Sequence, residues 1–273
     1  MSNKVAFISG AARGQGRAHA VRLAQDGYDI LAFDICRQID TVAYALPDRD
    51  DLEETADLVK QNGGDVHIEV ADVRDPAAVE AVVQAGMARF GRIDAVIANA
   101  GVMANMGPAS QTRAAWTDSI DILLSGVYNT INAAVDPLIK GGNGGAIVIT
   151  SSAAGLVGLV DGDPGNAGQL GYVAAKHGVV GLMRAYANLL APHSIRVNTV
   201  HPCGVNSPMI VNPQLEEHVE TRPQLVAAVQ NALPVDWIDC EDVANAVAFL
   251  VSDAGRYITG VTLPVDAGNV VRR

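Results

Sequence analysis

The sequence has few aromatic residues, few cysteines and fewer positive than negative charges. Aromatic residues make up 4% of the chain and hydrophobic residues 49%, a balance that favours helices packed on a parallel sheet over a β-sandwich. The cysteines Cys36, Cys203 and Cys240 lie far apart and show no C-x-x-C spacing. The sequence therefore predicts neither a disulfide framework nor a metal site, and it fits the reducing cytoplasm.

The charge balance and the lack of targeting signals exclude further classes of partner. A net charge of −11 argues against nucleic acid, because phosphate binding needs a clustered positive field. The N-terminus reaches a strand-like run early and shows no signal-peptide pattern, and no apolar stretch looks long enough to cross a bilayer. We expect a cytoplasmic protein that binds a small molecule rather than nucleic acid or a membrane.

The sequence does contain a regular alternation of strand-length apolar runs with helix-length amphipathic segments. This alternation predicts an α/β Rossmann fold: a doubly wound, seven-stranded parallel sheet with helices on both faces. No linker or composition break divides residues 1–273, so we expect a single domain that binds its ligand beyond the carboxyl ends of the strands. The predicted strands are residues 5–9, 30–34, 67–71, 95–99, 146–151, 196–201 and 262–265.

Three segments interrupt this alternation. Residues 37–51 and 158–171 are predicted to be surface insertions near the ligand edge of the sheet. Residues 205–237 are predicted to form a mobile substrate lid. Met209 and Trp237 are candidate walls of the substrate pocket, although either side chain could equally belong to the core.

A glycine-rich turn follows the first predicted strand. Gly10, Gly14 and Gly16, with Arg13 and Gln15 between them, lead directly into a predicted helix. Glycines permit a tight turn and a close backbone approach, so the N–H groups and the positive dipole end of the helix can meet a pyrophosphate. The pattern alone also fits a glycine-rich turn without a ligand, but its place between a strand and a helix favours dinucleotide binding.

Asp34, at the end of the second predicted strand, decides which dinucleotide is expected. A carboxylate at this distance from the glycines would accept hydrogen bonds from the adenosine ribose hydroxyls and would repel a 2′-phosphate. Arg13 argues the other way, because its guanidinium could pair with that phosphate. We give Asp34 more weight, since burying a carboxylate against a phosphate costs more than leaving a surface arginine solvated. The expected cofactor is NAD.

The ends of the third and fourth predicted strands carry further candidate cofactor contacts. Asp72, followed by Val73, could hold the adenine amino group. Asn99 precedes Ala100 and Gly101, whose small side chains would let the backbone pack beside the adenosine. Either motif could also be ordinary strand-end turn chemistry.

Tyr172 and Lys176 form the candidate catalytic pair, because residues four apart share one face of a helix. To act as a base at neutral pH, a tyrosine hydroxyl must lower its pKa by about 3 pH units, or roughly 4 kcal/mol. The Lys176 ammonium and an oxidised nicotinamide ring would together supply the positive charge for that change, and Lys176 could also hold the nicotinamide ribose. Ser152 would bind the substrate oxygen, with Ser151 as the neighbouring candidate.

Together these motifs resemble the short-chain dehydrogenases/reductases, and the resemblance spans essentially the whole chain, ending at the Gly-Val-Thr-Leu-Pro-Val-Asp-Ala-Gly tract of residues 260–268. It implies that Tyr172 is the general acid/base, Lys176 the ribose anchor and activator, and Ser152 the residue that polarises the substrate oxygen. It also implies assembly as a homotetramer through the long helices near residues 116–138 and 172–190.

The same resemblance identifies a nicotinamide loop and two departures from the family. Pro202, Val205 and Ser207 lie where the family holds the carboxamide, and Cys203 replaces the usual glycine. A scattered cysteine is more often inert packing than a reactive thiol. Leu123 stands where the family usually has an asparagine that helps to hold a water in a proton relay.

The insertion at residues 37–51, with Cys36 before it, and the tract at residues 177–184 resemble the branch with carveol dehydrogenases and other actinobacterial mycofactocin-associated members. That resemblance implies oxidation of a hydrophobic secondary alcohol, such as a carveol-like terpenoid, to its ketone. It also implies tightly held NAD and a mycofactocin-type redox partner.

Two other functions compete with this one. A 3-oxoacyl carrier-protein reductase would prefer NADPH and an acidic carrier protein, and Asp34 and the acidic surface both argue against it. A catalytically silent NAD-binding protein would have lost its chemistry, whereas Ser152, Tyr172 and Lys176 are all present.

Overall fold

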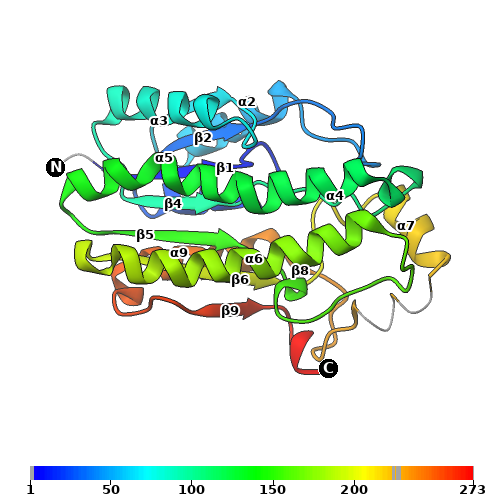
Figure 1. Ribbon diagram of the computed structural model, residues 1–273. Helices are drawn as coiled ribbons and strands as arrows, with labels where there is room; N and C mark the ends of the chain where they lie inside the picture. Colours follow the sequence, from blue (N-terminus) through cyan, green and yellow to red (C-terminus); the bar gives the residue numbers. More distant parts are fainter. Residues whose placement is uncertain (1–2, 223–224, 226–228, 273) are drawn as a thin grey trace.

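One parallel sheet of seven strands organises the computed structural model, which describes residues 3–222, 225 and 229–272. The strand order is β3-β2-β1-β4-β5-β6-β9 (Figure 1). The strands are β1 (Lys4–Ser9), β2 (Tyr28–Asp34), β3 (Val66–Val70), β4 (Ala95–Ala98), β5 (Gly145–Thr150), β6 (Ile195–Pro202) and β9 (Thr262–Val265). The predicted single-domain, doubly wound Rossmann fold is confirmed, because each strand predicted from its apolar run is part of this sheet.

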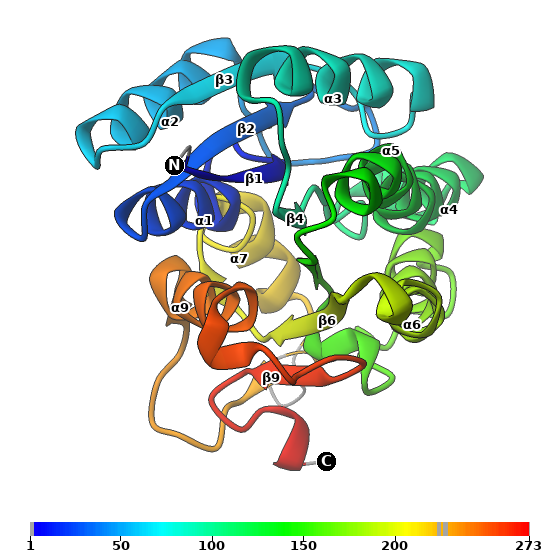
Figure 2. The ribbon, with the colours of Figure 1, turned by 90° about the vertical axis from the view of Figure 1, so that its left-hand side faces the viewer.

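Helices cover both faces of the sheet, which explains why β1, β4 and β5 are almost entirely buried apolar runs. Figure 2 shows the two layers on either side of the strands. One layer consists of α1 (Gly14–Gln25), α2 (Arg49–Gln61) and α9 (Cys240–Val251). The other contains α3 (Pro76–Phe90), α5 (Gly126–Gly141) and α6 (Ala167–Leu190).

A continuous helical stretch, Arg113–Gly141, joins α4 (Arg113–Ile120) to α5 through a π-helical turn at Asp121–Ser125. By length and composition alone this stretch could cross a membrane, so the expectation that no apolar stretch is long enough was wrong. Ile131 and Leu138 are buried in the core on the sheet side. The apolar composition is that of a helix packed inside a domain.

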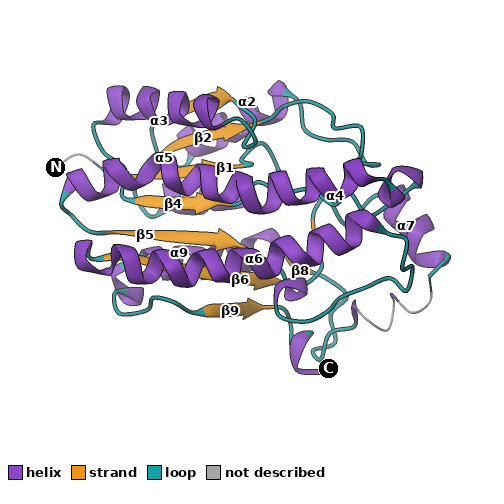
Figure 3. Cartoon of the chain, in the orientation of Figure 1, coloured by secondary structure: helices purple, strands orange, loops and turns teal. Residues whose placement is uncertain are grey.

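The strand order reverses between β1 and β4, and this reversal creates the ligand-binding edge. From β1 the chain first builds outward through β2 and β3 and then returns to β4 on the other side of β1. Such a switch point opens a crevice beyond the carboxyl ends of the strands. Figure 3 shows that the arrowheads point toward the end of the molecule where α4, α7 (Pro213–Glu220) and several long loops gather.

The insertion predicted at residues 37–51 is less exposed than expected. It lies between β2 and α2, which begins at Arg49 with an Asp48 capping box. Ile39, Val42 and Tyr44 are 7%, 4% and 2% exposed and join the core cluster. The prediction of a surface loop is thus only partly correct, because the segment folds back onto the sheet edge.

The second predicted insertion and the predicted lid also contain regular structure. Residues 158–166 form a loop, whereas residues 167–171 already belong to α6, whose N-cap is Asn166. The lid region contains α7 and β7 (Val205–Asn206), which pairs with β8 (Ile238–Asp239) directly after the lid. Residues 223–224 and 226–228 of the lid lie outside the described residues, as do residues 1–2 and 273.

Candidate active site

A pocket at the carboxyl edge of the sheet brings together most of the predicted site residues. Ser152, Pro202 and Val205 are not among its lining residues, although Ser151 is. Predicted residues that line it are Gly10, Arg13, Gly14, Gln15, Gly16, Asp34, Asp72, Val73, Asn99, Ala100, Gly101, Tyr172, Lys176 and Ser207. The chain thus collects, in one cavity, residues as far apart in the sequence as Gly10 and Met209.

The glycine turn is shaped for a close approach of backbone to ligand. Gly10 has φ +69, and a Cβ there would lie 2.6 Å from the Cα of Ala100. A Cβ on Gly16 would lie 1.9 Å from the Gly10 carbonyl oxygen. The side-chain oxygen of Gln15 is buried without a hydrogen-bond partner among the described residues. With the helix N-terminus beside it, this cradle fits a dinucleotide phosphate.

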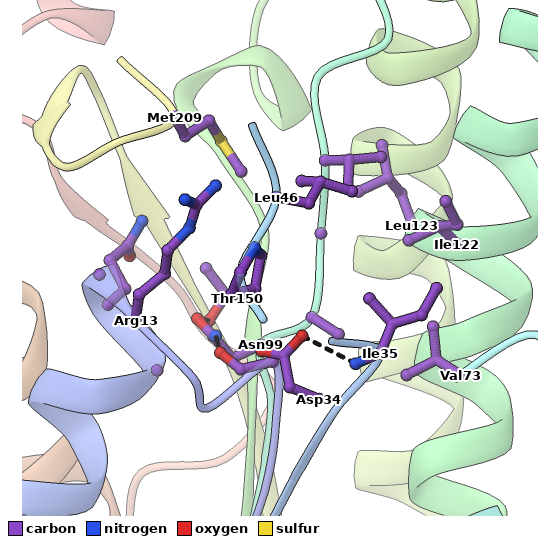
Figure 4. A pocket seen from close by; sticks show the side chains of 18 of the residues that line it. Arg13, Asp34, Ile35, Leu46, Val73, Asn99, Ile122, Leu123, Thr150 and Met209 are labelled. Carbon is purple, nitrogen blue, oxygen red and sulfur yellow. Dashed lines mark hydrogen bonds between the residues drawn. The ribbon is translucent and has the colours of Figure 1, made fainter. Parts of the chain in front are cut away.

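Asp34 is held at the floor of the pocket (Figure 4). Its two carboxylate oxygens accept hydrogen bonds from the backbone N–H groups of Ala12, at 3.0 Å, and Ile35, at 2.8 Å. Burial raises the pKa of Asp34, and these backbone bonds oppose the rise. The carboxylate therefore has a fixed orientation and keeps acceptor positions for a ligand hydroxyl.

Arg13 is engaged elsewhere. Its guanidinium donates to the carbonyl of Ala45, in the insertion after β2, and Figure 4 shows the side chain extending away from Asp34 toward Met209. Arg13, which from the sequence could have paired with a 2′-phosphate, thus connects the glycine turn to the insertion.

Asp72 lies at the pocket rim inside a network of charges. Arg74 donates to both of its carboxylate oxygens at 2.7–3.0 Å, and Arg37 donates to one at 2.9 Å. These contacts lower the pKa of Asp72 although its burial opposes the change. An adenine amino group needs a free acceptor here, so that contact remains a prediction that requires Arg37 to move.

Asn99 joins three neighbouring strands beneath the pocket. Its amide donates to the carbonyls of Ser9 and Gly10, at 3.3 and 3.1 Å, and its oxygen accepts from the Thr150 hydroxyl at 3.1 Å. In the structure the Asn99 side chain fixes the ends of β1, β4 and β5, and its direct contact with a cofactor stays a prediction.

Tyr172 and Lys176 project from α6 into the same pocket. The Lys176 ammonium donates to the carbonyl of Thr150 at 2.8 Å and lies 5.7 Å from the centre of the Tyr172 ring. Burial lowers the pKa of Lys176 to about 8. Burial raises the pKa of Tyr172, whereas a hydrogen bond with Ser152 opposes that rise. The protein groups alone therefore do not lower the tyrosine pKa, and its lowering by Lys176 together with an oxidised nicotinamide ring stays a prediction.

The structure separates the two candidate serines. The Ser151 hydroxyl is buried and donates to the backbone carbonyl of Lys176 at 2.9 Å, so it fixes α6 against β5. The Ser152 hydroxyl accepts from the Ala154 N–H at 3.2 Å, and it is the side chain that opposes the rise in the pKa of Tyr172. Ser152 is thus the serine next to the candidate catalytic hydroxyl.

The predicted nicotinamide loop begins at the end of β6. Pro202 ends that strand, Val205 is buried in β7, and Ser207 reaches the pocket. Burial raises the pKa of the Cys203 thiol to about 11. Cys203 is therefore held as an unreactive thiol at neutral pH.

Leu123 lies in the π-helical turn and is buried against the cofactor side of the pocket. A Cβ on Gly101 would lie 3.0 Å from a Leu123 methyl group and 3.9 Å from the Lys176 ammonium. The side of the pocket behind Lys176 is thus apolar where the family has an amide. π-Helical turns often mark functional sites.

Several residues that line the pocket were not predicted from the sequence. Tyr44, Leu46 and Pro47 reach it from the insertion, and Thr150 from the end of β5. The position of Thr150 directly before the two serines could have indicated it. Nothing local to residues 44–47 indicates contact with a ligand, because that contact depends on how the insertion folds back.

Comparisons with known proteins find relatives that match along nearly the whole chain. A family model described as enoyl-(acyl carrier protein) reductase matches residues 10–269. A (-)-trans-carveol dehydrogenase from Rhodococcus erythropolis is 43% identical over 100% of this chain and 99% of that protein. The solved carveol dehydrogenase from Mycobacterium avium in complex with NAD is 47% identical, has a TM-score of 0.90 and aligns over 99% of both chains.

Two further proteins, one of similar and one of lower sequence identity, match this chain. A short chain dehydrogenase from Mycobacterium paratuberculosis bound to NAD is 42% identical, with a TM-score of 0.90 over 99% of this chain and 98% of that chain. A 3-oxoacyl-[acyl-carrier-protein] reductase from Staphylococcus aureus is more distant, at 34% identity over 97% of each. The chain belongs to the short-chain dehydrogenase family, as an oxidoreductase that acts on CH–OH groups.

Proposed function

We propose that this protein oxidises a hydrophobic secondary alcohol, such as a carveol-like terpenoid, to its ketone with NAD as cofactor. The observation that carries the proposal is one pocket lined by Tyr172, Lys176, the glycine turn and Asp34. The relatives from R. erythropolis and M. avium, one named for carveol and the other crystallised with NAD, support this substrate class and cofactor.

The residues divide the work of binding and of proton transfer. The glycine turn would hold the pyrophosphate, Asp34 the adenosine ribose hydroxyls, and Lys176 the other ribose. NAD, when bound, supplies the hydride acceptor and a positively charged ring. Ser152 would hold the substrate oxygen beside Tyr172, whose deprotonated phenolate oxygen would take the alcohol proton as the carbonyl forms.

The positive charge of Lys176 suits this role because it is buried. It is 5% exposed, and a charge in a water-poor site acts more strongly on a neighbouring phenolate than a charge in bulk water. Since burial raises the pKa of Tyr172, the tyrosine gives up its proton only when positive charge surrounds it. Proton transfer is thereby tied to a loaded site.

The apolar part of the pocket favours an apolar substrate. Val102, Ile122, Leu123 and Met209 line it together with Tyr172. A hydrocarbon substrate gains from such walls without leaving buried polar groups unpaired.

NAD is proposed to be held tightly under the insertion after β2, and a mycofactocin-type partner would then reoxidise it in place. The insertion is fastened by several bonds: Arg37 to Asp72, Thr41 to Asp118, and the Met103 N–H to the Tyr44 hydroxyl. Each bond joins it to a different part of the fold. A cover fastened in this way slows exchange of what lies beneath it.

A cytoplasmic homotetramer is proposed as the working form. Tyr128 on α5 and Leu189 on α6 are 45% and 68% exposed, and both lie on the long helices expected to form the subunit contacts. Exposed large apolar side chains of this kind are typical of interfaces.

The carrier-protein reductase is the weaker alternative. Its NADPH would bring a phosphate against buried Asp34, and Arg13 is already bonded to the insertion. A catalytically silent protein has no specific observation in its favour.

The test is turnover of carveol by wild-type protein and by Tyr172→Phe, with an artificial electron acceptor present. We expect turnover to fall by about 10²–10⁴-fold, while the amount of NAD bound stays the same. Tyr186→Phe, the same change on the same helix, is the control. Undiminished turnover by Tyr172→Phe would refute the assigned chemistry.

A further inference from the structure

A cluster of buried polar side chains lies on the substrate side of the active site, outside the pocket described above. It joins the loop of residues 158–166, the start of α6 and α7. Figure 1 shows α7 at the same end of the molecule as the start of α6. The exposed fractions of its members are Asn105 6%, Asp161 2%, Asn166 0%, Gln169 3% and His218 5%.

Asp161 is the charged centre of this cluster. One carboxylate oxygen accepts from the Asp163 N–H at 3.0 Å. The other accepts from the Asn166 amide at 2.7 Å and lies 3.3 Å from His218 Nε2 and 3.4 Å from Arg222 Nε. The Asp163 N–H, the Asn166 amide nitrogen and the Arg222 guanidinium are all hydrogen-bond donors, and the Asp161 carboxylate is an acceptor for each of them. An asparagine at position 161 would replace one acceptor oxygen with an NH₂ group that points at another donor.

The partners of Asp161 lie on two elements that form the substrate side. Asn166 is the N-cap of α6, the helix that carries Tyr172, and it accepts from the Gln169 N–H at 2.9 Å. His218 belongs to α7, and Arg222 follows that helix directly. A buried carboxylate thus ties α7 to the capped end of the catalytic helix.

The position of α7 in turn determines the position of Met209 in the pocket wall. Asn212, the N-cap of α7, donates to the carbonyls of Pro208 and Met209 at 3.0 and 2.9 Å. Leu215 of α7 is buried in the core cluster against which Met209 and Tyr172 pack. Movement of α7 would therefore move Met209 in the wall of the pocket that Tyr172 also lines.

We propose that Asp161 is a positioning residue for substrate binding: it holds α7, and through it Met209, against the start of α6. The proposal rests on the proposed function, because it takes the space between Met209 and Tyr172 as the alcohol site. Asp161 does not line the pocket, so its effect on substrate is transmitted through α7. It determines how well a bulky apolar alcohol fits.

The test compares Asp161→Asn with wild type on carveol and on 2-propanol, which is too small to reach the α7 side. We expect the KM for carveol to rise about tenfold or more, which corresponds to about 1.4 kcal/mol, with kcat changed less than about twofold. The KM for 2-propanol and the bound NAD should stay the same. Asp136→Asn, the same change at an aspartate on α5 whose side chain is 75% exposed, is the control, and His218→Gln is the second variant if Asp161→Asn does not fold.

Hydrogen exchange gives a readout that does not depend on turnover. In Asp161→Asn the amides of residues 214–220 of α7 should exchange faster, whereas those of α9 should not change. An unchanged KM for carveol, or unchanged protection of α7, would overturn the proposal. If wild-type protein does not oxidise carveol, the proposed function fails, and the exchange of α7 still decides whether Asp161 holds it.

Discussion

At the scale of single residues, the site depends on charges placed where water does not solvate them. Asp34, Asp161 and Lys176 are all less than 9% exposed, and each has at least one hydrogen-bond partner that fixes its direction. Buried charges are costly unless they are paired or hydrogen-bonded. These buried charges therefore lower the free energy of unfolding, and we expect them to be kept because they serve ligand binding and proton transfer.

Lys176 gives a direct measure of that cost. Its folded pKa of about 8 lies below the ordinary value of 10.5, so between these values the unfolded chain binds more protons than the folded one. Stability should therefore rise as the pH rises through this window. In nucleotide-free wild type we expect a gain of about 2 kcal/mol in unfolding free energy between about pH 7.5 and 9.5 that Lys176→Met lacks.

Urea unfolding of both proteins at the two pH values measures this gain. All other titrating groups cancel in the difference between wild type and variant. Equal gains in the two proteins would show that Lys176 is not a destabilising buried charge.

At the scale of elements, the insertion after β2 is the structural feature that distinguishes the cofactor end of the pocket. It supplies Ile39, Tyr44 and Leu46 to the lining. Thr41, which does not line the pocket, donates to Asp118 of α4 at 2.6 Å, and Asp118 also accepts from Arg74 at 2.9 Å. The insertion is thus bonded to the helix that precedes the π-helical turn.

Removing this bond should release the cofactor without touching its contacts. In Thr41→Val the shape is kept and a charged hydrogen bond worth about 1.5–3 kcal/mol is lost. After extensive dialysis we expect wild type to retain near-stoichiometric NAD and Thr41→Val to retain far less. The nucleotide freed on denaturation is identified and quantified by mass spectrometry.

Thr117→Val is the control, because Thr117 is exposed on the same helix. Full retention by Thr41→Val would mean that the insertion does not hold the cofactor through this bond. Empty wild-type protein would mean that NAD exchanges freely, and bound NADP would mean that Asp34 was given too much weight against Arg13.

At the scale of the whole molecule, two layers of helices enclose the sheet so completely that titratable groups are buried deep inside it. His19 on α1 and His201 on β6 are both 0% exposed. Burial lowers the pKa of each from 6.5 to about 4. Each histidine is neutral in the folded protein across the physiological range.

This burial predicts sensitivity to acid. Below about pH 6.5 the unfolded chain takes up protons on these histidines and the folded protein does not until about pH 4, so stability falls as the pH falls through this window. His19→Leu should lose about 2 kcal/mol less than wild type between about pH 7.5 and 5. Exposed His193 provides the control His193→Gln, measured by the same urea unfolding, and an identical acid loss in His19→Leu would contradict the prediction.

Much of the fold was predictable from sequence because its signals are local. The apolar runs at the seven strands, the glycines at 10, 14 and 16, and the spacing of Tyr172 and Lys176 each lie within a short stretch of chain. The apolar periodicity of a strand and the backbone freedom of a glycine depend only on residues close in the sequence, so both can be recognised without the tertiary structure. The apolar helix 126–141, in contrast, could not be assigned to a core without its partners.

By itself, the sequence determined the seven-stranded parallel sheet, the glycine turn and the helix that carries Tyr172 and Lys176. Only the tertiary structure decided that the insertion is packed onto the sheet edge, that Asp72 is already held by arginines, and that Asp161 joins α7 to α6. It also decided that burial raises the pKa of Tyr172 rather than lowering it. The reason is that burial and ion pairing arise from contacts between residues far apart in the chain, and these contacts exist only once the layers have packed.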